Sequence, residues 1–253
     1  CIRDRTWGWD RQADLPGNCV PFLSPELAAI RNQHRAQDDS LVLVGARMSL
    51  NGMRFDCIPR PRAMLQYRAD KLRFLGALPD GIRKASRYRP YTRSSIDLED
   101  GPFITRHFSD VPLVMTGFQE AMLHCRLLVL DHPGTTLNMA LAANVPFVAF
   151  WNRHDWPLCH EAQPYFDQLA TCGVLHDEPE QAARHIATIW DQVGTWWSRP
   201  EISSAVAQCR QRFARTGTLA NLDLVRTLWR LSQTEMQVQP IREAAPSPHP
   251  APR

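Results

Sequence analysis

Several features that would point to a particular class of protein are scarce in this sequence of 253 residues. Lys71 and Lys84 are the only lysines among the 29 basic residues. Neither lies in a Gly-Lys-Ser/Thr sequence, which excludes a phosphate-binding loop of the Walker A type. The longest apolar run, residues 145–151, is far shorter than the ~20 residues needed to span a bilayer. We therefore expect neither a Walker-type nucleotide-binding protein nor a transmembrane segment.

Cysteine and metal-ligand patterns are equally sparse. The seven cysteines are widely spaced, and no two of them form a Cys-x-x-Cys pair. Disulfide frameworks use even numbers of cysteines, and structural zinc sites use closely spaced pairs. Cys125 beside His124, and Cys172 near His176, supply ligand types without such a framework. The sequence predicts no metal and no cofactor, and its cysteine usage favours a reducing cytoplasm.

The charge balance argues against nucleic acid as a partner. The net charge is +3, from 29 basic and 26 acidic residues that are spread along the chain. Nucleic-acid-binding domains instead concentrate basic residues on one face. Hydrophobic residues make up 44% and charged residues 22%, which is ordinary for a folded globular protein. Because the chain begins at Cys1 and not at methionine, we expect a piece of a longer protein.

Composition divides the chain into three segments. Residues 1–40 are irregular, and we expect a linker or the remnant of a preceding domain, with Ser24 capping a short helix that begins at Pro25. Residues 41–233 alternate apolar runs with helical periods, which predicts one α/β domain. Residues 234–253 are rich in Pro, Ala and Ser, which predicts a disordered tail.

The α/β segment is typical of a Rossmann-like parallel sheet flanked by helices, with a helical C-terminus. Short apolar runs at residues 41–44, 127–130 and 145–150 suit strands that are buried on both faces. The span over residues 118–150 predicts helix, strand, turn, helix and strand, which is one right-handed crossover unit. Further elements are expected at residues 83–89 (strand), 161–170 (helix), 173–175 (strand), 178–193, 200–215 and 219–232 (helices).

One amphipathic helix is expected after a long loop over residues 47–62. Leu65, Leu72, Leu75 and Leu78 follow a helical period, whereas Lys71 and the neighbouring charged residues fall outside it. The pattern therefore predicts an apolar face that includes Leu65 and a polar face that includes Lys71.

The turn that follows residues 127–130 is the first candidate site. In open α/β sheets, ligands bind beyond the carboxyl ends of the strands. Gly134 permits close approach of a ligand, and Thr135 and Thr136 place hydroxyls at a helix start, where free N–H groups favour an anion. His132 would donate to the same anion. A phosphate or diphosphate is the natural guest; the alternative is a plain helix cap after a tight turn, with a structural histidine.

Neighbouring segments supply further candidates. Asp131 would orient the turn by accepting backbone N–H bonds. The next strand end should lie beside it, where Arg153 could pair with phosphate and Glu161 could accept hydrogen bonds from a ribose diol. The alternatives are a surface charge for Arg153 and a carboxylate facing the helix dipole for Glu161. Arg87 and Arg89 form either an anion-binding pair or a solvated basic edge.

Five stretches together resemble a known family. They are His132–Trp151 (HPGTTLNMALAANVPFVAFW), Trp156, Ala162–Phe166 (AQPYF), His176–Ala183 (HDEPEQAA) and the pair Trp196 and Trp197. Their order and spacing, over residues 65–213, are similar to those of a family of bacterial transferases linked to surface polysaccharide.

The resemblance implies a glycosyltransferase-like enzyme of GT-B type, of which this chain is the C-terminal, donor-binding half. It implies an upstream N-terminal domain, a nucleotide-activated sugar or alditol phosphate as donor, and a glycan or lipid-linked acceptor. It places the donor diphosphate at the turn 134–136. The usual general base of such enzymes belongs to the N-terminal half, so we assign no catalytic residue. Two alternatives share the fold: a non-catalytic nucleotide-binding or assembly module, and a GT-B-like sugar-nucleotide epimerase.

Overall fold

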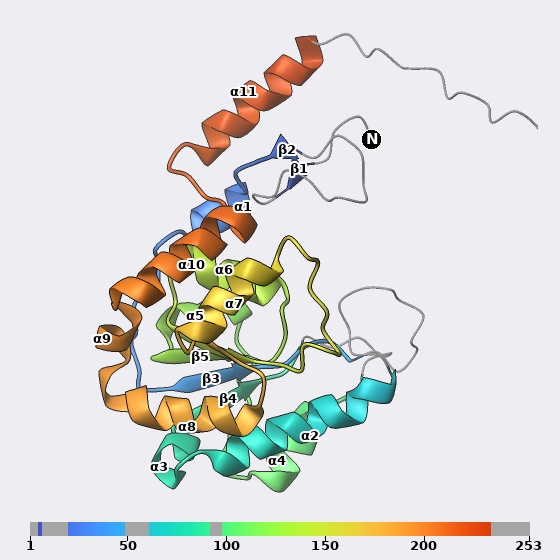
Figure 1. The fold of residues 1–253 in the computed structure, drawn as a ribbon, viewed down its shortest axis with the longest axis vertical. Coiled ribbons are helices and arrows are strands. Elements are labelled where there is room, and N and C mark those ends of the chain that lie inside the picture. The colour runs from blue at the N-terminus through green and yellow to red at the C-terminus, as the bar shows by residue number, and fades with distance from the viewer. Residues whose placement is uncertain (1–4, 7–19, 49–60, 92–97, 234–253) are drawn as a thin grey trace, which may run out of the picture.

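A computed structural model of the chain describes residues 5–6, 20–48, 61–91 and 98–233 (Figure 1). Its centre is a five-stranded parallel sheet with the strand order β4-β3-β5-β6-β7. The strands are β3 (Leu41–Val44), β4 (Ser86–Arg89), β5 (Leu127–Leu130), β6 (Phe147–Phe150) and β7 (Leu175–His176). A separate pair of two-residue strands, β1 (Arg5–Thr6) and β2 (Val20–Pro21), also runs parallel. The Rossmann-like parallel sheet predicted from the sequence is confirmed.

Helices cover both faces of the five-stranded sheet. The helices are α1 (Pro25–Ala29), α2 (Pro61–Ala77), α3 (Asp80–Lys84), α4 (Gly101–His107), α5 (Phe118–His124), α6 (Thr135–Ala143), α7 (Gln163–Thr171), α8 (Pro179–Ile189), α9 (Val193–Trp197), α10 (Pro200–Phe213) and α11 (Ala220–Gln233), with a 3-10 turn at Trp190–Gln192. Helices α2 and α8 pack together on one side, whereas α6, α7 and α10 form a layer on the other. The chain therefore has the layered α/β architecture in which a buried sheet separates two helical layers.

The central strands lie where they do because their residues are apolar on both faces. Every residue of β3, β5 and β6 is buried, as the continuous apolar runs predict. Strand β4 alternates buried and exposed residues, which suits its place at the edge of the sheet. The ring of Phe74 on α2 stacks on that of Phe150 at a centroid distance of 5.0 Å and so joins the helix to β6.

The crossover unit predicted over residues 118–150 is confirmed. Helix α5, strand β5, helix α6 and strand β6 follow one another, and β5 pairs with β6 in parallel. Helix α6 ends at Asn144, whose φ of 58° is the left-handed conformation that closes many helices. Ser24 caps α1, and Pro25 occupies its first turn, as predicted.

Some boundaries differ from those predicted. The expected strand over residues 83–89 is divided between the end of α3 and β4, because Asp80 and Pro79 start a helical turn there. Helix α7 begins at Gln163 instead of residue 161, and β7 lies at residues 175–176 instead of 173–175. The predicted tail, residues 234–253, and most of the predicted loop over residues 47–62 lie outside the described residues.

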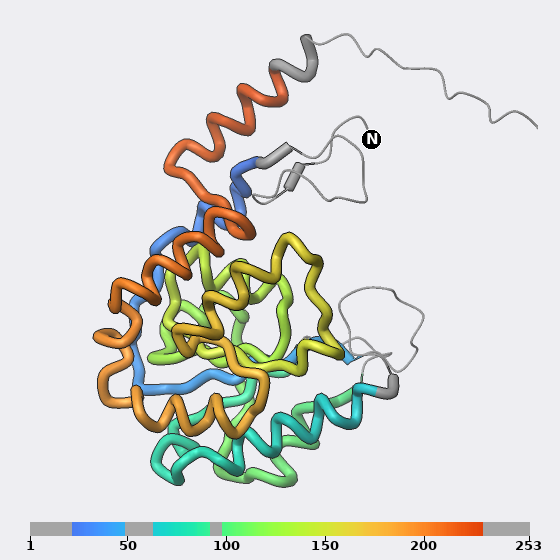
Figure 2. The backbone as a smooth tube through the Cα atoms, viewed as in Figure 1, coloured from blue at the N-terminus to red at the C-terminus, as the bar shows by residue number. Residues whose placement is uncertain are grey.

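Helix α11 extends away from the sheet at the end of the described chain (Figure 2). Its apolar residues Leu222, Val225, Leu228 and Trp229 are exposed, whereas Ala220 at its start is buried. Among the described residues, no helix combines the length and the apolar character that a membrane span requires.

Candidate functional site

The candidate site lies at the carboxyl edge of the sheet, where the chain leaves β5 and turns into α6. Asp131 directly follows β5 and is 1% exposed; His132 is also buried. The next residue along the turn, Pro133, leads to Gly134, which is the N-cap of α6. The prediction that the end of β6 lies beside this turn is confirmed, because β5 and β6 are neighbouring strands.

The Asp131 carboxylate holds the imidazole of His132. Nδ1 of His132 lies 2.8 Å from Oδ1 of Asp131, so the ring donates its Nδ1 proton to the carboxylate. A Cβ built on Gly134 would lie 2.5 Å from Nε2 of His132. The second ring nitrogen therefore rests against the N-cap of α6, and glycine is the one residue that leaves it room there.

The start of α6 has unsatisfied backbone donors. Gly134 offers no side chain to cap the helix, and the first N–H groups of an α-helix have no acceptor within the helix. Thr135 is exposed, whereas the Oγ1 atom of Thr136 is buried without a hydrogen-bond partner in the described part of the chain. The turn thus presents amide and hydroxyl donors together with an imidazole, which are the groups that bind an anion at a helix N-terminus.

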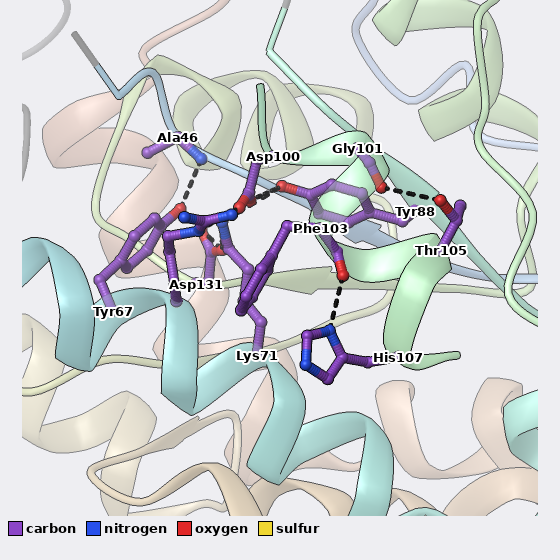
Figure 3. A network of polar contacts seen from close by, with 11 residues as sticks. Ala46, Tyr67, Lys71, Tyr88, Asp100, Gly101, Phe103, Thr105, His107 and Asp131 are labelled. Atoms are coloured by element: carbon purple, nitrogen blue, oxygen red, sulfur yellow. Dashed lines mark hydrogen bonds and ion pairs between the residues drawn. The ribbon is translucent and has the colours of Figure 1, made fainter. Parts of the chain in front are cut away.

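Behind the turn lies a buried ionic network, shown in Figure 3. Lys71 on α2 is fully buried, and its ammonium group pairs with Asp100 and lies 3.6 Å from Oδ2 of Asp131. The Tyr88 hydroxyl on β4 donates to Asp100 and lies 3.2 Å from Nζ of Lys71. Arg68 adds a second positive charge, with its Nε 3.2 Å from Oδ1 of Asp100. Two buried carboxylates are thus balanced by two cations.

The network sets the charge state of its members. Burial alone would raise the pKa of Asp100, but Lys71, the Tyr88 hydroxyl and Arg68 together hold that pKa below its ordinary value. Burial, and then the nearby carboxylates, raise the pKa of Tyr88 well above its ordinary value. Asp100 is therefore a carboxylate, and Tyr88 is a neutral hydroxyl that donates a hydrogen bond to it.

Tyr67 links this network to the backbone of β3. Its hydroxyl accepts a hydrogen bond from the amide of Ala46 at 2.6 Å and donates to Oδ2 of Asp131 at 2.8 Å. Burial and the charge of Asp131 raise the pKa of Tyr67 well above its ordinary value, so this hydroxyl remains a donor. Asp131 therefore accepts side-chain hydrogen bonds from Tyr67 and His132, where we had expected backbone N–H donors.

Trp156, in the loop after β6, covers the turn. Its ring lies 5.6 Å from that of His132 and 6.2 Å from that of Tyr67, measured between centroids. A cavity of ≈ 10 Å³, about the space for one water molecule, is lined by Tyr67, Asp131, Trp151 and Trp156, among others. The inner side of the turn is thus closely packed.

Arg153 and Glu161 also follow β6. The Arg153 guanidinium pairs with two carboxylates, with Nη1 2.6 Å from Oδ1 of Asp167 and Nε 2.7 Å from Oδ1 of Asp177. Glu161 is half-buried in the turn two residues before α7. Arg153 thus sits near α7 and the end of β7, with Nη1 hydrogen-bonded to Asp167 and Nε close to Asp177 without a hydrogen bond to it.

The two arginines of β4 point to different ends of the sheet. Arg87 is exposed, and its Nη1 lies 3.1 Å from Oδ2 of Asp38, which precedes the amino end of β3. Arg89 is at the carboxyl end, half-buried, with Nη1 donating to the carbonyl of Pro90; burial lowers its pKa. The structure therefore places Arg89 at the same edge of the sheet as the turn and directs Arg87 away from it.

Sequence reasoning missed the inner network. The predicted polar position of Lys71 is wrong, because the buried carboxylates of Asp100 and Asp131 supply partners that a periodicity count does not see. Leu65, expected on the apolar face, is 78% exposed. The one available signal was the spacing of Tyr67 and Lys71, which are four residues apart and so share a helix face. Among the described residues, no group of three or more His, Cys, Asp or Glu residues could hold a metal ion.

The fold defines a Rossmann-like α/β domain, and the turn after β5 leads into the uncapped start of α6. Residues 5–228 match the LIC12162 family of transferases, and the chain belongs to that family. The resemblance to a transferase family seen in the sequence is confirmed. No curated protein matches the chain at a significant level.

Solved structures of glycosyltransferases resemble the fold. The spinosyn forosaminyltransferase SpnP matches with a TM-score of 0.43 and 13% identity, over 85% of this chain and 50% of its own. WaaG, a glycosyltransferase involved in lipopolysaccharide biosynthesis, matches with a TM-score of 0.44 and 14% identity, over 84% of this chain and 56% of its own. The glycotransferase of kitacinnamycin matches with a TM-score of 0.38 and 15% identity, over 77% of this chain and 44% of its own. The chain thus spans about half the length of each of these structures.

Proposed function

We propose that this chain is the donor-binding half of a glycosyltransferase-like enzyme, and that the start of α6 binds the diphosphate of a nucleotide-activated sugar or alditol phosphate. The observation that carries the proposal is the uncapped N-terminus of α6, with the buried Thr136 hydroxyl and the His132 ring beside it. Amides, hydroxyls and imidazoles are suitable donors to phosphate oxygens.

The chemistry of the turn suits a departing phosphate. When an acceptor hydroxyl attacks the activated carbon of the donor, the bond to the phosphate oxygen breaks and negative charge develops on the phosphates. Preorganised N–H and O–H donors stabilise such charge without reorienting during the reaction. The amides of Thr135 and Thr136 and the Thr136 hydroxyl would carry this role, and the His132 ring would join them as a donor once Nε2 also holds a proton.

Arg153 and Glu161 belong to an outer part of the proposed site. Arg153 pairs with Asp167 and Asp177 in the ligand-free chain, so a phosphate contact requires that it exchange one of these carboxylates for the ligand. Glu161 would accept from the ribose diol, and Arg89 would add positive charge at the same edge. The direction of Arg87 toward Asp38 does not favour a role for it.

The proposal extends to the whole enzyme and its place in the cell. The acceptor, a glycan or a lipid-linked sugar, would bind an N-terminal domain that also supplies the general base. The product would be part of a bacterial surface polysaccharide, assembled in the cytoplasm or at the cytoplasmic surface of the inner membrane. The family match to transferases and the fold support this extension.

Calorimetry with CMP-, CDP-, UDP- and GDP-linked sugars tests the donor site. Thr136→Val keeps the shape of the side chain and removes its hydroxyl, so we expect affinity to fall about 10- to 100-fold, as for a hydrogen bond to a charged group. Thr188→Val is the matched control: it also removes a threonine hydroxyl, but that of Thr188 lies on α8 and donates to the carbonyl of His185. If no nucleotide binds the folded wild-type chain, the donor-site proposal is wrong and a non-catalytic assembly module becomes the better interpretation.

A further inference from the structure

The two oxygens of Asp131 have separate partners. Oδ2 accepts from the Tyr67 hydroxyl at 2.8 Å and lies 3.6 Å from Nζ of Lys71. Oδ1 accepts from Nδ1 of His132 at 2.8 Å. Because the partners from α2 occupy one oxygen, the carboxylate is oriented with the other oxygen toward His132.

The buried charges of this arrangement carry a large cost of desolvation. Lys71 is fully buried, and Asp131 and Asp100 are 1% and 5% exposed. Replacing buried ion pairs with apolar side chains of similar volume is often neutral or stabilising, so ion pairs of this kind add little to stability by themselves. Tyr67 belongs to the same arrangement, because its hydroxyl joins the Ala46 amide to Asp131.

We propose that Tyr67 is a positioning residue for the donor site. Its hydroxyl, with Lys71 beside it, holds Oδ2 of Asp131, so that Oδ1 stays bonded to the Nδ1 proton of His132. The ring of His132 is thereby kept with Nε2 against the start of α6. The polar chain runs from the Ala46 amide through the Tyr67 hydroxyl and Asp131 to His132. The tautomer of His132 follows from its contact with Asp131 and needs no ligand. The effect of this tautomer on ligand affinity rests on the proposed function.

The placement of Nε2 matters because the turn leaves it little freedom. Trp156 packs on the ring, and the missing side chain of Gly134 makes room for Nε2. A ring with its proton on Nδ1 offers Nε2 to whatever binds at the helix start, as an acceptor when neutral and as a donor after it takes up a proton. A ring in the other tautomer would lose its hydrogen bond to Asp131.

Tyr88 provides a matched control for Tyr67. Both tyrosines are almost fully buried, both have raised pKa values, and both donate to a buried carboxylate of the same network. The Tyr88 hydroxyl donates to Asp100 and not to Asp131. A merely structural role predicts that Tyr67→Phe and Tyr88→Phe change the protein alike, whereas the positioning role predicts that they differ at His132.

The test is a long-range ¹H–¹⁵N correlation spectrum of the whole chain with ¹⁵N-labelled histidine, which reports the tautomer of each ring. His132→Gln assigns the signal, and the exposed His154 serves as an internal reference. We expect Nδ1–H in the wild type and in Tyr88→Phe, and a mixture that approaches that of His154 in Tyr67→Phe. An unchanged His132 signal in a folded Tyr67→Phe variant, or an equal change in Tyr88→Phe, would overturn the proposal.

A second measurement separates this proposal from the donor-site proposal. Titration with the same nucleotide-sugars should show affinity reduced about tenfold or more in Tyr67→Phe, as expected when a hydrogen bond to a charged ligand is lost, and little change in Tyr88→Phe. If the wild type binds none of them, the donor-site proposal fails, and the tautomer spectra still decide the role of Tyr67. If Tyr67→Phe shifts the tautomer but leaves affinity unchanged, His132 is positioned by Tyr67 and does not contact the donor, which overturns the ligand part of the proposal.

Discussion

The hydroxyl of Tyr88 occupies the space in which a side chain at Gly45 would begin. A Cβ on Gly45 would overlap with that hydroxyl and would lie 3.3 Å from Nζ of Lys71. Gly45 directly follows β3, and its amide donates to the carbonyl of Arg89 at 3.1 Å. The buried network thus depends on a strand end with no side chain.

Gly45→Ala should therefore destabilise the protein. The new methyl group has to displace a buried tyrosine hydroxyl that is held by Asp100, so we expect a loss of about 2–3 kcal/mol, the upper part of the range for overpacking. Gly194→Ala is the control, because nothing lies within 4 Å of a Cβ on that helical glycine. It should stabilise by about 0.5–1 kcal/mol. Denaturant unfolding measures both, and equal effects of the two variants would contradict the explanation.

The two lysines of the chain should differ in their contribution to stability. Lys71→Met leaves the buried Asp100 and Asp131 with Arg68 as their remaining cation, so we expect a loss of about 3–5 kcal/mol. Lys84→Met, at an exposed position on α3, should stay within about 0.5 kcal/mol of the wild type. Adding Asp100→Asn to Lys71→Met should recover part of the loss, because a charge imbalance causes it. A double variant as unstable as the sum of the two single ones would disprove that cause.

Gly134→Ala should move the His132 ring. The added Cβ would lie 2.5 Å from Nε2, and the ring cannot simply swing away because Asp131 holds its other nitrogen. We expect a changed His132 signal in the histidine spectrum and at least about tenfold weaker nucleotide-sugar binding. Gly117→Ala is the control, since Gly117 is also an N-cap glycine and nothing lies within 4 Å of its Cβ position. Equal loss of binding in both variants would argue against a role for the His132 ring.

The stability of the fold should fall in mild acid because of a half-buried histidine, His185. Burial, and then the positive charges of the neighbouring His176 and Arg199, lower the pKa of His185 from 6.5 to about 4. The folded chain keeps this ring neutral, whereas the unfolded chain takes up a proton below about pH 6.5. The contribution of the neutral His185 ring to the free energy of unfolding is therefore complete above pH 6.5. It is lost as the pH falls toward 4, and the loss is up to about 3 kcal/mol.

The variant His185→Gln tests this pH dependence. Urea unfolding between pH 7 and pH 4 should show a shallower loss of stability in His185→Gln than in the wild type. His154→Gln, at an exposed histidine, should keep the wild-type slope. A wild-type slope in His185→Gln would mean that another group causes the loss.

The sequence predicted the sheet and the turn because both depend on local patterns. The apolar runs at residues 41–44, 127–130 and 145–150 have no polar face to expose, so each must be buried on both sides. Pro133 and Gly134 before a pair of threonines mark the end of one element and the start of the next. The resemblance to a transferase family rests on the same local stretches.

The sequence alone could not predict how the side chains at the carboxyl edge are paired. Lys71, Asp100 and Asp131 come from a helix, a helix start and a strand end that are far apart in the chain, and each looks like an ordinary surface charge. Arg153 looks like a free phosphate ligand until the structure brings Asp167 and Asp177 to it.

Sequence by itself therefore determined the class of fold, the crossover unit and the location of the turn between β5 and α6, since these follow from the periodicity of neighbouring residues. Only the tertiary structure decided which charges are buried, which oxygen of Asp131 faces His132, and that Tyr67 holds the other. The physical reason is that a buried charge is tolerated only beside its partners, and those partners come together only when distant segments pack.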